Sequence, residues 1–73
     1  MLLRLFRREH CALCELAAEA LLEAEATAEV LYLEDDAALE QVYGWRIPVL
    51  QRMDTGAELD WPFDSWKLRK FLV

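Results

Sequence analysis

The chain has 73 residues and a formal net charge of −6, and 56% of its residues are hydrophobic. A chain of this length and apolar content forms one small domain with a modest core, so we expect a single domain over residues 1–73 and exclude a disordered protein. The acidic balance argues against nucleic acid as a partner, and the lack of a run of about 20 apolar residues argues against a membrane span.

The first half of the chain predicts a strand, a helix and a second strand. Residues 2–6 form a short apolar run, interrupted at Arg4, that we predict as a strand. Residues 12–26 are rich in Ala, Leu and Glu, the best helix formers, and predict a long helix. The apolar positions of this helix share one broad face: Leu13, Leu16, Ala17, Ala20, Leu21 and Ala24. Residues 28–33 are almost continuously apolar, which is typical of a strand buried on both faces of a parallel sheet.

A short helix follows the second strand. Asp35 or Asp36 is suited to cap its start, and the helix runs to about Tyr43. Gly44 then supplies the stop signal. The first two strands are joined by a helix, so we expect them to pair in parallel through a right-handed crossover.

The last third of the chain predicts a hairpin and a final helix. Residues 47–52 and 57–61 read as two antiparallel strands, separated by turn residues. Asp64 is placed to cap the last helix. The apolar residues that share a face of this helix are Leu68, Phe71 and Leu72.

The two cysteines of the chain, Cys11 and Cys14, stand where the first helix begins. Free backbone N–H groups and the helix dipole at this end favour a thiolate, which is the form of cysteine that attacks a disulfide. Two cysteines are too few for the disulfide framework of a small secreted protein. We therefore expect a cytoplasmic protein whose cysteine pair is reactive.

Three other interpretations of the pair stay open. A closed zinc site needs four ligands, and His10 is the only other His or Cys in the chain. A metal or iron–sulfur cluster shared between two chains needs fewer ligands from each. In the third interpretation the two cysteines are buried and inert.

Three short segments of the chain carry a resemblance to a known family. They are CALCE at residues 11–15, YGWRIPVL at residues 43–50 and ELDWPFD at residues 58–64. Together with the order of elements, these segments resemble the short glutaredoxin-like proteins of the thioredoxin superfamily over nearly the full chain. The resemblance implies an α/β, thioredoxin-like fold with the order βαβαββα and a four-stranded mixed sheet.

The resemblance implies that Cys11 is the nucleophile of a dithiol thiol–disulfide oxidoreductase and that Cys14 is the resolving thiol. Cys11 lies nearer the helix end, so the physics of the thiolate favours the same order. We expect a monomer that acts on protein or glutathione disulfides and requires no cofactor, with glutathione as a co-substrate. The alternative is a non-catalytic binding module that holds a metal, an iron–sulfur cluster or a partner protein at the same cleft.

The resemblance also implies that Pro48 follows a cis peptide bond and faces the cysteine pair. In that geometry the backbone N–H and C=O of Ile47 are available to an extended substrate. The other interpretation is an ordinary trans proline at a strand start. Arg46 either attracts a substrate carboxylate, such as that of glutathione, or is a solvated loop residue. Trp45 either forms a wall of the cleft or covers the core.

Charged residues near the cysteines bear on the thiolate. Arg7 and Arg8 add positive charge close to the nucleophile, and His10 does so when protonated, whereas Glu9 and Glu15 oppose them. Glu15 is also a candidate to handle the proton of the resolving thiol. A first-turn acid that simply favours the helix dipole is the preferred interpretation of this residue.

Two segments depart from the pattern of typical glutaredoxins. Ala12 and Leu13 replace the Pro-Tyr that usually separates the cysteines. The segment WPFD at residues 61–64 replaces a pair of glycines followed by an acid, which in the family binds the amino and carboxylate groups of glutathione. Asp64 keeps the acidic, helix-capping role. The loss of the glycines favours a protein disulfide over glutathione as the substrate.

Overall fold

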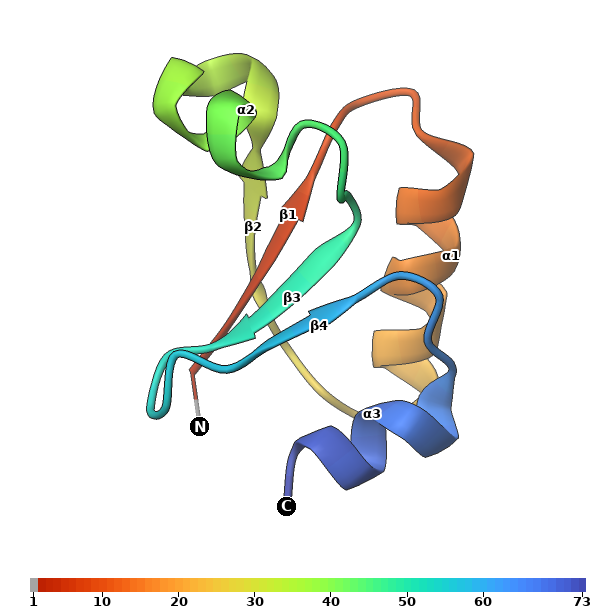
Figure 1. Cartoon of the computed structure of the whole chain (residues 1–73). Coiled ribbons are helices and arrows are strands. Elements are labelled where there is room, and N and C mark those ends of the chain that lie inside the picture. The colour runs from red at the N-terminus through yellow and green to blue at the C-terminus, as the bar shows by residue number, and fades with distance from the viewer. Residues whose placement is uncertain (1) are drawn as a thin grey trace.

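Four strands form one mixed sheet in the computed structural model, which describes residues 2–73 (Figure 1). The strands are β1 (Leu3–Arg7), β2 (Glu29–Tyr32), β3 (Val49–Arg52) and β4 (Glu58–Asp60). The helices are α1 (Ala12–Glu23), α2 (Ala37–Tyr43) and α3 (Ser65–Phe71), and a 3₁₀ turn, η1 (Leu33–Asp35), precedes α2. The element order confirms the prediction, with boundaries shifted by one to three residues.

The sheet has the strand order β2-β1-β3-β4. β1 pairs in parallel with β2, placing Phe6 beside Leu31, and antiparallel with β3, placing Phe6 opposite Val49. β3 and β4 form the predicted antiparallel hairpin. The carboxyl end of β1 therefore lies at the same edge of the sheet as the beginning of β3, and this edge carries the cysteine turn.

The two faces of the sheet bury separate apolar clusters, as the alternation of side chains along β1 requires. Leu3 and Leu5 point to the face covered by α1 and α3, and Phe6 points to the face covered by α2. On the α2 face, the rings of Phe6 and Tyr43 stack with their centroids 4.1 Å apart. The other buried members of the α1 face are Ala17, Ala20, Leu21, Leu50, Phe63 and Leu68.

The second strand differs from its prediction. Residues 28–33 were expected to be buried on both faces, but β2 is an edge strand and Val30 is 43% exposed. An edge strand lacks a neighbour on its outer side, so its side chains are only partly covered. Leu33 is fully buried, but it begins η1 and does not extend the strand.

Helix α1 ends three residues earlier than predicted. The Ala26 N–H donates to the Leu21 carbonyl at 2.9 Å and the Glu25 N–H donates to the Leu22 carbonyl at 3.0 Å. This pair of hydrogen bonds is a Schellman motif, in which one residue takes a left-handed conformation. Glu25 has φ 55° and occupies that position, which glycine usually fills. The sequence therefore carried no stop signal.

The buried face of α1 also differs from its prediction. Cys14, Ala17 and Leu21 face the sheet, whereas Leu13 and Leu16 are 47% and 48% exposed. The helix is thus rotated so that its apolar stripe centres on Cys14, and two leucines are left at the solvent edge.

The other two helices begin as predicted. The Asp36 side chain accepts hydrogen bonds from two N–H groups of α2, and the Asp64 side chain accepts one from the Lys67 N–H of α3. Gly44 follows α2 with ordinary right-handed helical angles, so it ends the helix without the left-handed geometry that usually selects glycine.

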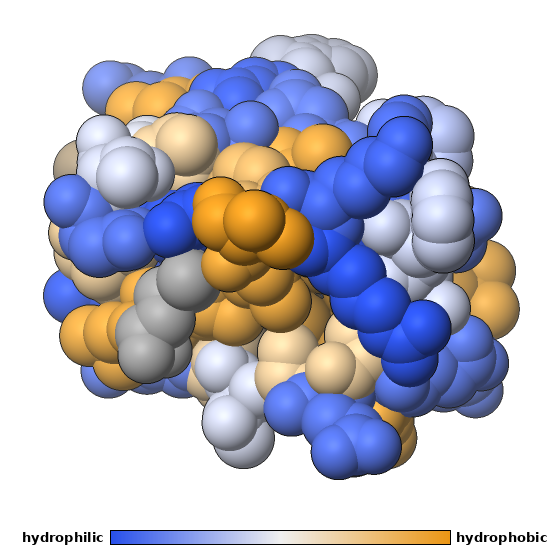
Figure 2. All heavy atoms as spheres, turned by 90° about the horizontal axis from the view of Figure 1, so that it is seen from below, coloured by the Kyte–Doolittle hydropathy of each residue, from blue (hydrophilic) through white to orange (hydrophobic). Residues whose placement is uncertain are grey.

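The end of the molecule opposite the α1 N-terminus has an apolar hollow of about 220 Å³. Figure 2 shows this end from below, with apolar residues at its centre and polar residues around them. The hollow is lined by Leu3, Ala24, Glu25, Ala26, Thr27 and Leu72. Among residues 2–73, no helix has the length and apolar character needed to cross a membrane.

Candidate functional site

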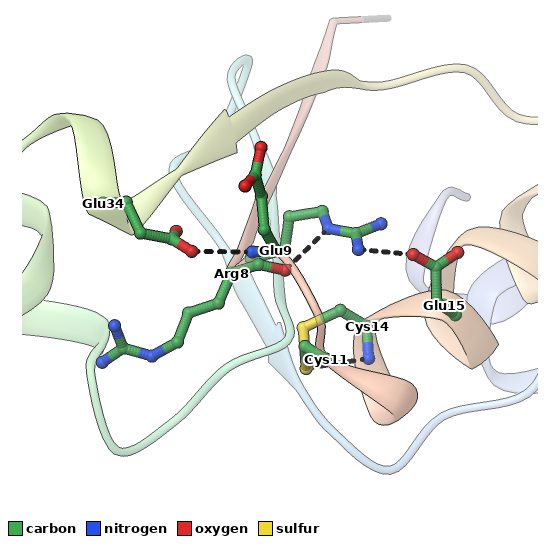
Figure 3. Close-up of a disulfide and its surroundings, with 7 residues drawn as sticks. Arg8, Glu9, Cys11, Cys14, Glu15 and Glu34 are labelled. Atoms are coloured by element: carbon green, nitrogen blue, oxygen red, sulfur yellow. Dashed lines mark hydrogen bonds and ion pairs between the residues drawn. A yellow bond between two sulfur atoms is a disulfide. The ribbon is translucent and has the colours of Figure 1, made fainter.

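Cys11 and Cys14 are joined by a disulfide in the first turn of α1, with their Cα atoms 5.2 Å apart (Figure 3). Cys11 is the N-cap residue of the helix, and its Sγ accepts a hydrogen bond from the Cys14 N–H at 3.2 Å. Cys14 is fully buried, whereas Cys11 is half-buried. A molecule in solvent can therefore contact part of Cys11, whereas Cys14 is shielded.

This placement has a chemical consequence. A side chain at the N-cap lies among backbone N–H groups that have no partner within the helix, and these groups stabilise negative charge. When the disulfide is reduced, the Cys14 N–H remains available to a thiolate at Cys11. The arrangement is that of an accessible thiol at the electropositive end of a helix with a shielded thiol behind it.

The loop before Cys11 is tethered to the turn that follows β2. The Glu9 N–H donates to the Glu34 carboxylate at 2.9 Å (Figure 3). Hydrogen bonds from the backbone N–H groups of Glu34 itself and of Glu9 lower the pKa of the Glu34 carboxyl. His10 completes the loop in a left-handed conformation with φ 51°.

Arg7 occupies a buried position at the end of β1. Its guanidinium donates to the Glu15 carboxylate at 2.6 Å and to the Arg8 carbonyl at 3.1 Å, and it lies 5.4 Å from the centroid of the Tyr32 ring. The side chain is only 9% exposed. Arg7 was predicted to supply positive charge beside the nucleophile. Its charge is instead paired with Glu15, so it ties the end of β1 to the first turn of α1.

Arg8 is also paired with a carboxylate. Its guanidinium contacts Glu40 of α2, and Figure 3 shows the Arg8 side chain extending away from the cysteine pair. Its predicted influence on the thiolate is therefore reduced by the Glu40 charge and by its direction.

Arg46 lies over the α2 face of the sheet, beside β4. Its guanidinium makes two hydrogen bonds to Asp60, at 2.7 and 3.0 Å, and one to Glu58 at 2.7 Å. The Tyr43 hydroxyl donates to the same Glu58 at 2.6 Å. This network holds the loop between α2 and β3 against β4. A contact between Arg46 and a substrate carboxylate stays a prediction, and it would compete with this network.

The network shifts the titration of its members. The hydrogen bonds from Arg46 lower the pKa of the Asp60 carboxyl. The Tyr43 hydrogen bond, followed by that of Arg46, lowers the pKa of the Glu58 carboxyl. Burial, followed by the hydrogen bond to Glu58, raises the pKa of Tyr43 to about 12.

The Ile47–Pro48 bond is cis, as the resemblance implies, and Pro48 is buried. Phe6 is opposite Val49, so continuing the ladder by one position places Pro48 beside Arg7, just before the cysteine turn. The Ile47 N–H was expected to be available to a substrate. It donates to the Tyr43 carbonyl at 3.2 Å and is already used by the turn after α2.

The remaining predicted residues fall on two loops. Trp45 is 101% exposed, so it does not cover the core. Asp64 caps α3 through a 2.8 Å hydrogen bond from the Lys67 N–H and borders an open hollow of about 470 Å³. The hollow is also lined by Pro62, Phe63, Trp66 and Lys67.

The acidic partners of the three arginines were not predicted from the sequence. Glu58 and Asp60 alternate on one face of β4, and this pattern is the one sequence signal that points to a shared cationic partner. Glu40 lies 32 residues after Arg8 and Glu15 lies eight residues after Arg7 on the next element, so the fold decides both pairings. Within residues 2–73, no three or more His, Cys, Asp or Glu side chains are grouped so as to hold a metal ion.

Comparison with known proteins gives a family and solved structures that resemble the chain. The model of a family described as "Glutaredoxin-like domain (DUF836)" matches residues 2–73. The X-ray structure of the structural-genomics target protein XcR50 from X. campestris is 49% identical, with a TM-score of 0.90, and the match covers 96% of this chain and 93% of that chain. The solution structure of the same target is 51% identical, with a TM-score of 0.87 and coverage of 99% and 92%. No curated protein matches the chain.

Proposed function

The chain belongs to the glutaredoxin-like domain family and has a thioredoxin-like fold, and we propose that it is a thiol–disulfide oxidoreductase that uses Cys11 and Cys14. One observation carries the proposal. The two cysteines form a disulfide at the start of a helix, with Cys11 half-buried and Cys14 fully buried.

The proposed reaction starts from the reduced pair. The Cys11 thiolate attacks a substrate disulfide, forming a mixed disulfide and expelling one substrate thiolate. The Cys14 thiolate then attacks Cys11 Sγ, which forms the Cys11–Cys14 disulfide and expels the second substrate thiolate. Two electrons pass from the protein to the substrate, and the two thiol protons finish on the substrate sulfurs. The reaction requires no cofactor, because both electrons reside in the cysteine pair.

The burial of the two cysteines supports this division of roles. A bulky disulfide can approach Cys11, and the Cys14 N–H that contacts its sulfur favours the attacking thiolate. Cys14 has 0% exposure, so it reacts with a partner that is already attached to Cys11. The mixed disulfide is then resolved within the protein.

The residues around the pair are proposed to have supporting roles. Pro48 is buried at the end of the sheet that carries the cysteine turn, where it fixes the course of the preceding backbone, and the partly exposed Ile47 lines the edge of the substrate site. Arg7 positions the first turn of α1 through Glu15, and Arg46 positions the loop before Pro48 through Asp60. Arg8 and Asp64 hold the neighbouring segments in place through Glu40 and the α3 N–H groups.

Cysteine variants test the proposed function. The protein, supplied with dithiothreitol, should catalyse the reduction of hydroxyethyl disulfide, and Cys11→Ser should fall to the uncatalysed rate. Cys14→Ser keeps the attacking thiol but lacks the resolving one. After mixing with a disulfide substrate, it should therefore accumulate a mixed disulfide at Cys11, detected by intact mass and peptide mapping.

Two outcomes would contradict this function. One is full turnover in the Cys11→Ser variant, which would assign the reaction to another group. The other is the absence of turnover in the unmodified protein when circular dichroism shows that it is folded.

A further inference from the structure

We propose that the physiological substrate is a disulfide in a protein segment carrying apolar and basic side chains, and that glutathione disulfide is a poor substrate. This inference rests on the proposed function and adds the chemistry of the partner. Three features around the disulfide support it: two exposed leucines, three arginines already paired with carboxylates, and a surplus of acidic side chains.

The first feature is the leucine rim, defined as Leu13 and Leu16. Leu13 lies between the two cysteines and Leu16 follows three residues later, so the two side chains are neighbours on one side of α1. They are 47% and 48% exposed, although Cys14 and Ala17 on the same helix are fully buried. The exposed parts of these two leucines offer a contact to an apolar side chain of the partner segment. Glutathione has no large apolar side chain to place there.

The second feature is the state of the nearby cations. Glutathione carries two carboxylates, which proteins bind through unoccupied Arg or Lys side chains. Arg7 is engaged by Glu15, Arg8 by Glu40 and Arg46 by both Glu58 and Asp60. A carboxylate of glutathione at any of these guanidinium groups would meet a charge that a neighbouring carboxylate already offsets.

The third feature is the negative charge of the acidic side chains near the cysteine turn that form no salt bridge within the described part of the chain. Glu9 and Glu34 are exposed beside the cysteine turn, and among residues 2–73 neither forms a salt bridge (Figure 3). The chain as a whole has a net charge of −6. This field repels an anionic tripeptide and attracts a segment that carries Lys or Arg.

Matched peptide substrates test the inference. The reduced protein is mixed with one of three peptides, each with a single internal disulfide flanked by Leu and Lys, by Leu and Glu, or by Ser and Lys. Oxidised glutathione is the fourth substrate. Each rate is divided by the rate at which dithiothreitol reduces the same disulfide, which removes differences in the intrinsic reactivity of the substrates. We expect the Leu/Lys peptide to react about tenfold faster than the Leu/Glu peptide at low ionic strength, with the gap narrowing at about 1 M salt.

Helix variants separate the apolar contribution from the charge. The double variant Leu13→Ser/Leu16→Ser should bring the Leu/Lys and Ser/Lys peptides to similar normalised rates. Leu22→Ser is the matched control, because Leu22 is 76% exposed on the same helix but lies in its last turn, away from the cysteines. This control should retain the preference for the Leu/Lys peptide.

The results separate this inference from the function on which it rests. Equal normalised rates for the three peptides, or the highest rate for oxidised glutathione, would overturn the proposed partner and leave the oxidoreductase intact. If the protein reduces none of these disulfides, hydroxyethyl disulfide included, the result would contradict the proposed function itself.

Discussion

Pairing with carboxylates determines what each arginine near the cysteines contributes. Arg7 is the most buried, and its partner Glu15 directly follows Cys14 in the sequence. A buried guanidinium left without its carboxylate is strongly destabilising, so Arg7 is part of the scaffold of the cysteine turn. Arg46 has the same relation to the loop before Pro48.

Arg46 also makes the folding stability depend on pH. In the folded protein its hydrogen bonds lower the pKa of Asp60, and together with Tyr43 they lower the pKa of Glu58. The unfolded chain therefore binds more protons than the folded chain once the pH falls below about 4.5, the ordinary pKa of Glu58. The stability that the network supplies is present above this range and is lost as the pH falls through the lowered values.

The variant Arg46→Gln should weaken this dependence, because Glu58 keeps the hydrogen bond from Tyr43. Both carboxylates are partly solvated, so we expect a loss of about 1 kcal/mol at most at neutral pH, and a flatter dependence of stability on pH below about pH 4.5. Urea unfolding over a series of pH values measures both effects. Arg69→Gln is the control, because it removes the same charge from a guanidinium that donates to the Glu23 carbonyl. If the unfolding free energy of Arg46→Gln falls with decreasing pH as steeply as that of the unmodified protein, the network does not cause the pH dependence.

At the scale of elements, the order of strands and helices follows from apolar periodicity and from the capping residues Asp36 and Asp64, and both signals were present in the sequence. Helix α1 ends through a glutamate in the left-handed conformation, a position for which composition gives no signal. The edge position of β2 was likewise missed. Apolar composition predicts a strand, but it does not determine whether the strand lies at the centre or at the edge of the sheet, where its side chains are less covered.

The end of α2 depends on the lack of a side chain at Gly44. A Cβ at this position would lie 2.5 Å from the Glu40 carbonyl oxygen and 2.8 Å from its carboxylate. The backbone oxygen belongs to the last turn of α2 and accepts the Gly44 N–H, so it cannot easily move. Gly44→Ala should therefore destabilise the fold by about 1–3 kcal/mol, the usual effect of overpacking.

A second glycine provides the control for this variant. Gly56 has φ 78°, and a Cβ at this position would have no neighbouring atom within 4 Å. Gly56→Asn therefore meets no clash, and asparagine tolerates this left-handed conformation. Urea unfolding of the two variants compares them directly. A Gly44→Ala protein as stable as the Gly56→Asn protein would contradict the steric account.

At the scale of the whole molecule, the cysteine turn is joined to the core through Cys14, which is fully buried. The disulfide joins residues only three positions apart, so cross-linking the unfolded chain contributes about 2 kcal/mol in the chain-entropy model. Cys14 belongs to the buried core, whereas Cys11 is half-buried at its edge. We therefore expect reduction to lower the stability of the fold by about this amount and to leave Cys14 packed in the core.

The parts of the site that the sequence predicted are those that a short stretch of the chain carries. The cysteine pair, its place at a helix start and the proline at the beginning of the third strand were visible, because each is a local pattern. The pairing of Arg7 and Arg8 with Glu15 and Glu40 was not visible, since it joins segments that only the folded chain brings together. The cysteine motif was thus more predictable than the pairing of charges around it.

The reduction potential of the Cys11–Cys14 pair tests the central claim most directly. The protein is equilibrated with mixtures of reduced and oxidised glutathione, and the oxidised fraction is measured by mass spectrometry after alkylation. A redox-active pair should give a reversible two-electron transition with a potential between about −270 and −120 mV, the range of thioredoxin-fold oxidoreductases. A pair that stays oxidised throughout, with a potential below about −300 mV, would behave as a structural disulfide and contradict the account.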